Sequence, residues 1–120
     1  MNKKTVSDLS KKYLLKIADY YGFSKFQITT PYLSLEDSLY NDAESEDIVA
    51  EYCSMHNEIQ VYWKNIKSIE HLIRTLVHEY QHYLQSPSWM TRYYNQGYTY
   101  ENHPYELTAY SEEESWNKFI

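Results

Sequence analysis

Residues 69–84 of the chain read Ile-Glu-His-Leu-Ile-Arg-Thr-Leu-Val-His-Glu-Tyr-Gln-His-Tyr-Leu. Ser68 can cap the start of a helix here, and Pro87 lies just past its end. The apolar residues recur at intervals of three and four, the period of one helical face. They are Ile69, Leu72, Ile73, Leu76, Val77, Tyr80 and Leu84. The stretch therefore predicts an amphipathic helix that ends near Leu84.

Two histidines of this predicted helix are placed to bind one metal ion. His78 and His82 are one turn apart, so their side chains face the same way, with roughly 5–6 Å between Cβ atoms. Imidazole suits zinc, and a catalytic zinc keeps three protein ligands and one position for water. Glu79 follows the first histidine and can take a proton from that water. The alternative is a pair of surface histidines on an ordinary amphipathic helix.

The residues around these histidines resemble a known peptidase signature. Residues 75–84, Thr-Leu-Val-His-Glu-Tyr-Gln-His-Tyr-Leu, resemble the H-E-x-x-H motif of zincin metallopeptidases, with uncharged internal positions and a hydrophobic last one. Residues 105–110, Tyr-Glu-Leu-Thr-Ala-Tyr, are similar to the E-x-x-A element of minigluzincin and ImmA/IrrE-type peptidases. The metzincin continuation H-x-x-G-x-x-H is absent after His82. The resemblance is therefore to the gluzincin type.

This resemblance implies a zinc ion, Zn²⁺, bound by His78, His82 and Glu106, with Glu79 as the general base that activates zinc-bound water. Glu106 lies about 24 residues after His82, on a predicted last helix that begins near Pro104. The alternative for Glu106 is an exposed glutamate in the first turn of that helix, where the helix dipole favours it.

Two further roles in the site follow from the resemblance. His103 is predicted to stabilise the oxyanion, with Tyr98, Tyr100 and Tyr110 as alternatives. Larger gluzincins carry an Asp four residues after the ligand glutamate, where this chain has Tyr110. The partner that orients a zinc-bound imidazole is therefore left open between Tyr110, Glu113 and a backbone carbonyl.

The rest of the chain predicts an α+β fold of the minimal zincin kind: an N-terminal helix, a three-stranded sheet with a hairpin, the active-site helix and the glutamate helix. The first helix is expected over residues 5–21, capped by Ser7 or Asp8 and stopped by Gly22. Strands are expected at residues 26–29, 48–54 and 58–63, and loops at residues 32–47 and 86–101. By resemblance, residues 58–63 form the edge strand along which a peptide binds; an internal strand is the alternative.

Composition narrows the class of protein. The chain has 120 residues, which predicts one domain over residues 1–120. Its net charge of −6 argues against nucleic-acid binding, which needs Lys and Arg patches. Cys53 is the single cysteine, so an intrachain disulfide cannot form and a reducing, cytoplasmic location is expected. No apolar run is long enough for a membrane span, and no membrane partner is predicted.

Three functions fit these observations. The first is a zinc metallopeptidase, a hydrolase that cleaves peptide bonds of a peptide or protein substrate. The alternative is a zinc-containing module that binds a peptide or protein with little or no turnover. The third is a zinc hydrolase that acts on bonds other than peptide bonds. The sequence leaves open the substrate, the oligomeric state, and whether the last residues, 116–120, cover the cleft.

Overall fold

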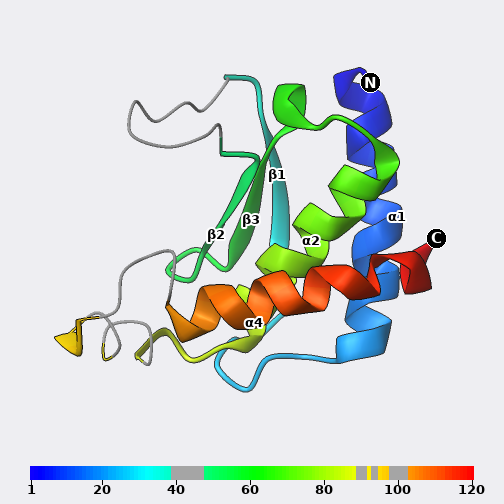
Figure 1. Ribbon diagram of the computed structural model, residues 1–120. Coiled ribbons are helices and arrows are strands. Elements are labelled where there is room, and N and C mark those ends of the chain that lie inside the picture. The colour runs from blue at the N-terminus through cyan, green and yellow to red at the C-terminus, as the bar shows by residue number, and fades with distance from the viewer. Residues whose placement is uncertain (39–47, 89–91, 93–94, 98–102) are drawn as a thin grey trace.

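The α+β fold expected from the sequence is confirmed by the computed structural model, which describes residues 1–38, 48–88, 92, 95–97 and 103–120 (Figure 1). Within these residues the chain forms three helices and a three-stranded mixed sheet, and two short 3₁₀ helices follow β3 and α4. In chain order the elements are α1 (Lys3–Tyr21), β1 (Tyr32–Glu36), β2 (Ala50–Cys53), β3 (Glu58–Tyr62), η1 (Trp63–Asn65), α2 (Ile69–Leu84), α4 (Pro104–Glu112) and η2 (Glu113–Phe119).

The hairpin is confirmed: β2 and β3 pair antiparallel, with Glu51 opposite Gln60. Asn57 turns the chain between them with a positive φ of 49°, a conformation that Asn tolerates better than most residues. Its side-chain amide donates to the carbonyl oxygens of Thr29 and Thr30, at 3.1 Å each. The turn is thereby tied to the segment that leads into β1.

The predicted first strand at residues 26–29 is wrong, because the strand is β1 at Tyr32–Glu36, which falls within the stretch expected as a loop. β1 pairs parallel with β3, with Leu33 opposite Ile59 and Leu35 opposite Val61. Phe26 and Ile28 are exposed instead. Leu33 and Leu35 alternate on a segment that pairs with the buried strand β3. Residues 26–29 alternate equally regularly but pair with no strand of the described sheet.

The sheet order is β1-β3-β2, so β3 is the central strand and the expectation that residues 58–63 form an edge strand is wrong. Both sides of the β3 backbone are occupied by β1 and β2. β2 forms the edge of the sheet that packs against α2, and one side of its backbone is unpaired within the described sheet. A peptide adding to the sheet on this side would pair with β2.

The helices form where the sequence indicates, with one correction at a cap. Ser68 caps α2, where its Oγ accepts a hydrogen bond from the backbone N–H of His71 at 3.1 Å. α1 begins two residues earlier than expected, and its cap is Asn2, whose Oδ1 accepts from the N–H of Thr5 at 2.8 Å. Ser7 and Asp8 therefore lie inside the helix. Asn is as good a cap as Asp or Ser, so the local pattern did not distinguish them.

Buried apolar side chains from α1, the sheet, α2 and η2 form one core, whose fully buried members include Val6, Ile17, Ile59, Val61, Leu72, Ile73, Leu76, Val77 and Tyr80. The chain end belongs to this core, because Phe119 is 2% exposed and its ring lies edge-on to Tyr20, 5.5 Å between centroids. Lys118 also donates to the Tyr20 hydroxyl, at 2.8 Å. These contacts hold the last residues against α1.

One further stretch differs from its predicted structure, and another lies outside the described residues. Residues 86–101 were expected as a loop, but Pro87, Ser88, Arg92 and Asn95 have helical backbone. The acidic run at residues 41–47 lies outside the described residues. No helix of the described chain is both long and apolar enough to cross a membrane.

Candidate metal centre

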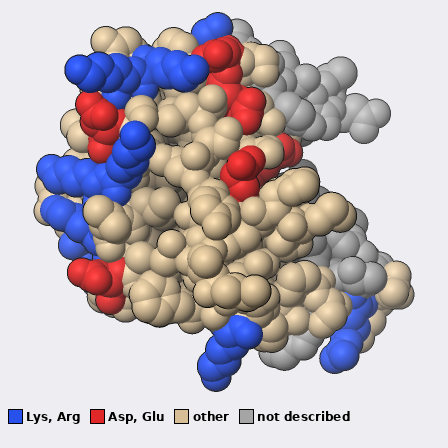
Figure 2. Space-filling model, turned by 180° about the vertical axis from the view of Figure 1, so that it is seen from behind, with Lys and Arg blue, Asp and Glu red and all other residues tan. Residues whose placement is uncertain are grey.

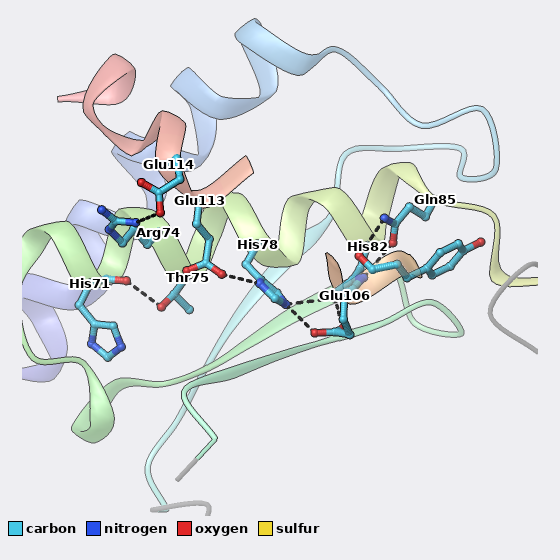
Figure 3. A network of polar contacts seen from close by, with 10 residues as sticks. His71, Arg74, Thr75, His78, His82, Gln85, Glu106, Glu113 and Glu114 are labelled. Carbon is cyan, nitrogen blue, oxygen red and sulfur yellow. Dashed lines mark hydrogen bonds and ion pairs between the residues drawn. The ribbon is translucent and has the colours of Figure 1, made fainter. Parts of the chain in front are cut away.

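Three side chains from two helices converge on one point between α2 and α4 (Figure 3). His78 Nε2 lies 3.1 Å from one carboxylate oxygen of Glu106, and His82 Nε2 lies 2.6 Å from the other. The two imidazole Nε2 atoms are 3.3 Å apart. The three residues predicted as zinc ligands are therefore brought together, and the alternative of an exposed Glu106 is wrong, since Glu106 is 5% exposed.

The arrangement fits a zinc ion. Zinc holds nitrogen and oxygen ligands at about 2.0–2.2 Å in a tetrahedron, which separates two ligand atoms by roughly 3.3 Å. The separations of 3.3 Å between the two Nε2 atoms and 3.1 Å between His78 Nε2 and Glu106 Oε2 are close to this value, and one ligand atom from each of the three residues lies within 4.8 Å of the others. The shorter 2.6 Å contact between His82 and Glu106 is a direct hydrogen bond that a shared ion would replace. Three ligands leave one tetrahedral position for water or substrate.

The two helices meet closely enough for this contact because the crossing involves a small residue. Glu106 and Ala109 are one turn apart on α4, and both are buried where α4 packs on α2. Ala109 is fully buried, so its methyl group leaves room for the backbones to approach. The Gln85 amide adds a polar link by donating to the carbonyl oxygen of Tyr105 at 3.3 Å.

Each ligand histidine is also held at its second ring nitrogen. His78 Nδ1 lies 2.8 Å from Glu113 Oε2, and His82 Nδ1 lies 2.9 Å from Gln85 Oε1. These contacts make Nδ1 the donor in both rings, which leaves Nε2 of each ring free to bind a metal when the imidazole is neutral. Of the three partners left open by the sequence, Glu113 is the one that orients His78. Tyr110 instead packs edge-on to the His78 ring, with 4.8 Å between centroids.

Glu113 follows Glu106 by seven residues, two helical turns, so the two carboxylates face α2 from the same side. The Gln85 contact was missed in the sequence, because Gln85 is the cap that ends α2 and has extended backbone, so helical spacing does not predict its contact with His82. η2, which Glu113 begins, is held in place by Arg74, whose guanidinium lies 3.3 Å from Glu114 and packs over the ring of Trp116.

The titratable groups of this site shift one another's pKa values. Burial lowers the pKa of His78, but hydrogen bonds with Glu106 and Glu113 outweigh burial and raise it to about 10. Burial raises the pKa of Glu106, but the two imidazoles outweigh it and lower the pKa to about 2. The pKa of His82 is also raised, mainly by Glu106 against the effect of burial. The two carboxylates therefore favour the protonated form of the His78 imidazole, and a metal bound at its Nε2 would compete with that proton.

Glu79 lies beside this group without belonging to it. The group of three residues in the described chain that could hold a metal ion does not include Glu79, which is 7% exposed. Burial raises the pKa of its carboxyl, and the neighbouring imidazoles His82 and His78 oppose that shift. A raised pKa brings a carboxylate closer to the range in which it is an effective proton acceptor near neutral pH. The environment is therefore suited to a general base.

The residues suggested for the oxyanion are placed differently. His103 caps α4, where its Nδ1 accepts from the N–H of Tyr105 at 3.1 Å, and it is 1% exposed. That contact gives His103 a structural role, and its role in catalysis stays a prediction. Tyr98 and Tyr100 lie outside the described residues. Tyr110 is half-exposed on α4, next to His78.

We expect Glu113→Ala to weaken zinc binding by about 10–100-fold, the usual effect of removing the partner that orients a ligand imidazole. Glu113→Gln keeps an acceptor for His78 Nδ1 and should recover most of the loss. Zinc affinity is measured by competition with a chromophoric chelator. Glu114→Ala is the matched control, because this neighbour pairs with Arg74 and has no contact with a ligand histidine. Equal affinities of the Glu113→Ala and Glu114→Ala variants would contradict the assignment.

Comparison of the chain with known protein families, with curated proteins and with solved structures gives no match. The functional argument therefore rests on the residues themselves and on their arrangement.

Proposed function

We propose that the protein is a zinc-dependent peptidase of the gluzincin type. The observation that carries the proposal is the convergence of His78, His82 and Glu106, whose ligand atoms lie within 4.8 Å of one another, with the buried Glu79 next to them. The order of these residues along the chain resembles H-E-x-x-H followed by E-x-x-A, and their helices cross as that order requires. This combination of ligands, open position and neighbouring carboxylate supports hydrolysis.

In the proposed reaction the side chains have separate tasks. Zinc, when bound, would polarise water and the substrate carbonyl as a Lewis acid. Glu79 accepts the proton of the attacking water and passes it to the leaving amine. His78 and His82 hold the metal, and Glu113 and Gln85 keep their rings in place. The low solvent exposure of Glu79 strengthens its electrostatic interactions with the reacting groups.

The unpaired side of β2 is the proposed binding site for an extended peptide. β2 is the edge strand that packs against α2, so a peptide hydrogen-bonded to its backbone runs past the metal site. Main-chain hydrogen bonds of this kind bind many sequences, and the side chains beside the strand decide which sequences bind best.

The second candidate is a zinc-containing module that binds a peptide or protein with little or no turnover. His103 bears on the choice, because its Nδ1 accepts the hydrogen bond that caps α4 and only its Nε2–H can then donate to an oxyanion, whereas a module without turnover needs no such donor. Both candidates share the metal site and differ in whether a bound peptide is cleaved.

We expect the protein, purified without a His-tag, to contain one zinc per chain and to cleave members of a diverse peptide library. Zinc is measured by atomic emission, and cleavage by mass spectrometry of the products. Chelator-treated protein, and the same protein with zinc restored, are the controls. Stoichiometric zinc without cleavage of any peptide would favour the binding module, and protein that takes up no zinc would contradict both candidates.

A further inference from the structure

The second edge of the sheet, strand β1, also has an unpaired side. Among the described strands β1 pairs with β3 alone. The backbone N–H of Tyr32 donates to the carbonyl oxygen of Asn57, so it points toward β3. Backbone groups alternate along a strand, so those of Leu33 and Leu35 point away from β3, where no described strand pairs with them. β1 therefore offers main-chain donors and acceptors to an added strand.

An apolar groove lies between β1 and α1, with a cavity volume of about 280 Å³. Leu14, Leu15 and Ala18 line it from α1, and Pro31 and Leu33 line it from the β1 side. Leu15 is 73% exposed, although it is a large aliphatic residue. The groove therefore leaves aliphatic surface in contact with water, directly beside the unpaired side of β1.

A strand added to β1 would place a side chain in this groove. Leu33 stands opposite Ile59, which is fully buried, so the Leu33 side chain lies on the face of the sheet that packs on the helices. A residue of the added strand that stands opposite Leu33 has its side chain on the same face. Because Leu33 lines the groove, that side chain lies beside Leu15 and Ala18. An aliphatic side chain buries the most apolar surface there.

The groove has a cation in its lining, the side chain of Lys11. Lys11 forms no ion pair with the described acidic residues, of which Asp8 is the one a helical turn away on α1. α1 carries five Lys and two Asp, whereas the whole chain has a net charge of −6. Figure 2 shows that Lys and Arg side chains gather along the side formed by α1. An acidic group is therefore the charged group that this groove attracts.

The direction of α1 fixes where along β1 this cation lies. Lys3, at the start of α1, pairs with Asp37, just after β1, at 2.8 Å, so the two elements run in opposite directions (Figure 1). Lys11 precedes the other lining residues of α1, so it lies toward the Leu35 end of the groove. On an added strand the residues opposite Leu33 and Leu35 are two positions apart and share one face. The aliphatic and the acidic residue are thus expected two positions apart.

We propose that the groove between α1 and β1 is a docking site for a partner protein, which adds an extended segment to β1 as the next strand. The segment carries an aliphatic side chain opposite Leu33 and an Asp or Glu opposite Leu35, near Lys11. Main-chain hydrogen bonds and the aliphatic side chain provide most of the affinity, and the acidic residue selects among sequences. β1 and β2 are opposite edges of the sheet, so this docking and the proposed peptidase activity are tested separately.

The probes are fluorescein-labelled peptide pools with Leu and Asp fixed two positions apart, in either order, and Thr, Val or Ser elsewhere. Binding to the full chain is measured by fluorescence anisotropy, and we expect it to saturate below about 1 mM. Replacing the fixed Leu by Ala should weaken binding roughly tenfold. Replacing the fixed Asp by Asn should weaken it about three- to fivefold at low salt. Equal binding of these pools, or no saturable binding of any pool, overturns the proposal.

Four single variants locate the binding on the chain. Lys11→Glu should abolish the preference for Asp over Asn, and Lys16→Glu is its control, with the same charge change on the same helix outside the groove lining. Leu15→Gln should weaken binding several-fold, whereas Leu107→Gln, at an exposed leucine of α4, should leave it unchanged. All four side chains are exposed, so the core stays intact. Equal weakening by Lys11→Glu and Lys16→Glu would show attraction by net charge alone and overturn the site.

Strand addition is tested with the same pools methylated at the backbone nitrogens of alternate residues. In an extended segment one set of alternate N–H groups points at β1 and the other points away. One methylated set should bind as the unmethylated pool does, and the other about tenfold more weakly. Equal binding of the two sets overturns the strand addition. Self-association of the chain in sedimentation, reversed by the unmethylated pool, would make a second copy the occupant and overturn the assignment to a partner protein.

Discussion

Replacing Glu79 by Gln should lower kcat for peptide hydrolysis by about 100-fold or more while zinc stays bound. Gln has the same length and a hydrogen-bonding end, but it cannot accept the proton of the attacking water. Glu79 is outside the group of three residues that can hold the metal, and its backbone position is turned about 100° from that of His78. The substitution therefore removes the proton acceptor without removing a ligand.

The Glu79 prediction is tested by measuring zinc content and the initial rate of peptide cleavage on the same preparation. Glu70→Gln is the matched control, because Glu70 lies in the first turn of the same helix and pairs with the partly exposed Arg74. We expect its rate to equal that of the wild type. Turnover by Glu79→Gln within a few-fold of wild type would refute the general-base assignment. Loss of zinc from this variant would show that Glu79 belongs to the metal site instead.

Replacing His82 by Ala should abolish stoichiometric zinc binding, with affinity falling by more than about 100-fold, because even partners that only orient a ligand contribute about 10–100-fold. His82 and His78 both contact Glu106. The substitution therefore removes one of the three expected ligands and also one of the contacts that join α2 to α4. Zinc binds the folded chain and thereby stabilises it, by about 4 kcal/mol at a free concentration 1,000 times Kd. For a domain of this size that raises Tm by about 10 °C or more.

The measurement for His82 is the change in Tm on adding zinc to chelator-treated protein. The wild type should show the full rise and His82→Ala almost none, whatever the stability of each zinc-free protein. His71→Ala is the control, since His71 lies on the same helix but its Nδ1 accepts from the backbone N–H of Lys67, outside the metal site. A wild-type Tm that does not respond to zinc would contradict the link between metal and fold. A full rise in His82→Ala would remove His82 from the ligand set.

Local patterns were enough for the elements that carry the ligands. The helical period and the cap at Ser68 located α2, and the first-turn Pro104 located α4, because both signals act between residues a few positions apart. The spacing of His78 and His82 made them neighbours on any helix. The pairing of Glu106 with them came from resemblance, and the crossing of α4 over α2 bears it out.

The same kind of local evidence was incomplete where one residue can have two roles. His103 sits before Pro104, where a helix needs an acceptor for its first N–H groups, and its ring nitrogen supplies one. A motif comparison considers only the catalytic chemistry of such a histidine and does not test whether its side chain caps a helix. Residues Tyr32–Glu36 were assigned to a loop because the residues after them are acidic, although their own apolar alternation is typical of a strand.

The sequence by itself determined the α+β class, α2 with His78 and His82 on one face, and the position of Glu79 beside them. Only the tertiary structure decided that β1 pairs with β3, that β2 is therefore the edge strand of the described sheet next to α2, and that Glu113 holds His78. The physical reason is the range of the interactions. Helical period and capping act between residues within one or two turns of a helix. Strand pairing and imidazole orientation depend on residues up to tens of positions apart. Burial of the shared core decides which of these distant residues meet.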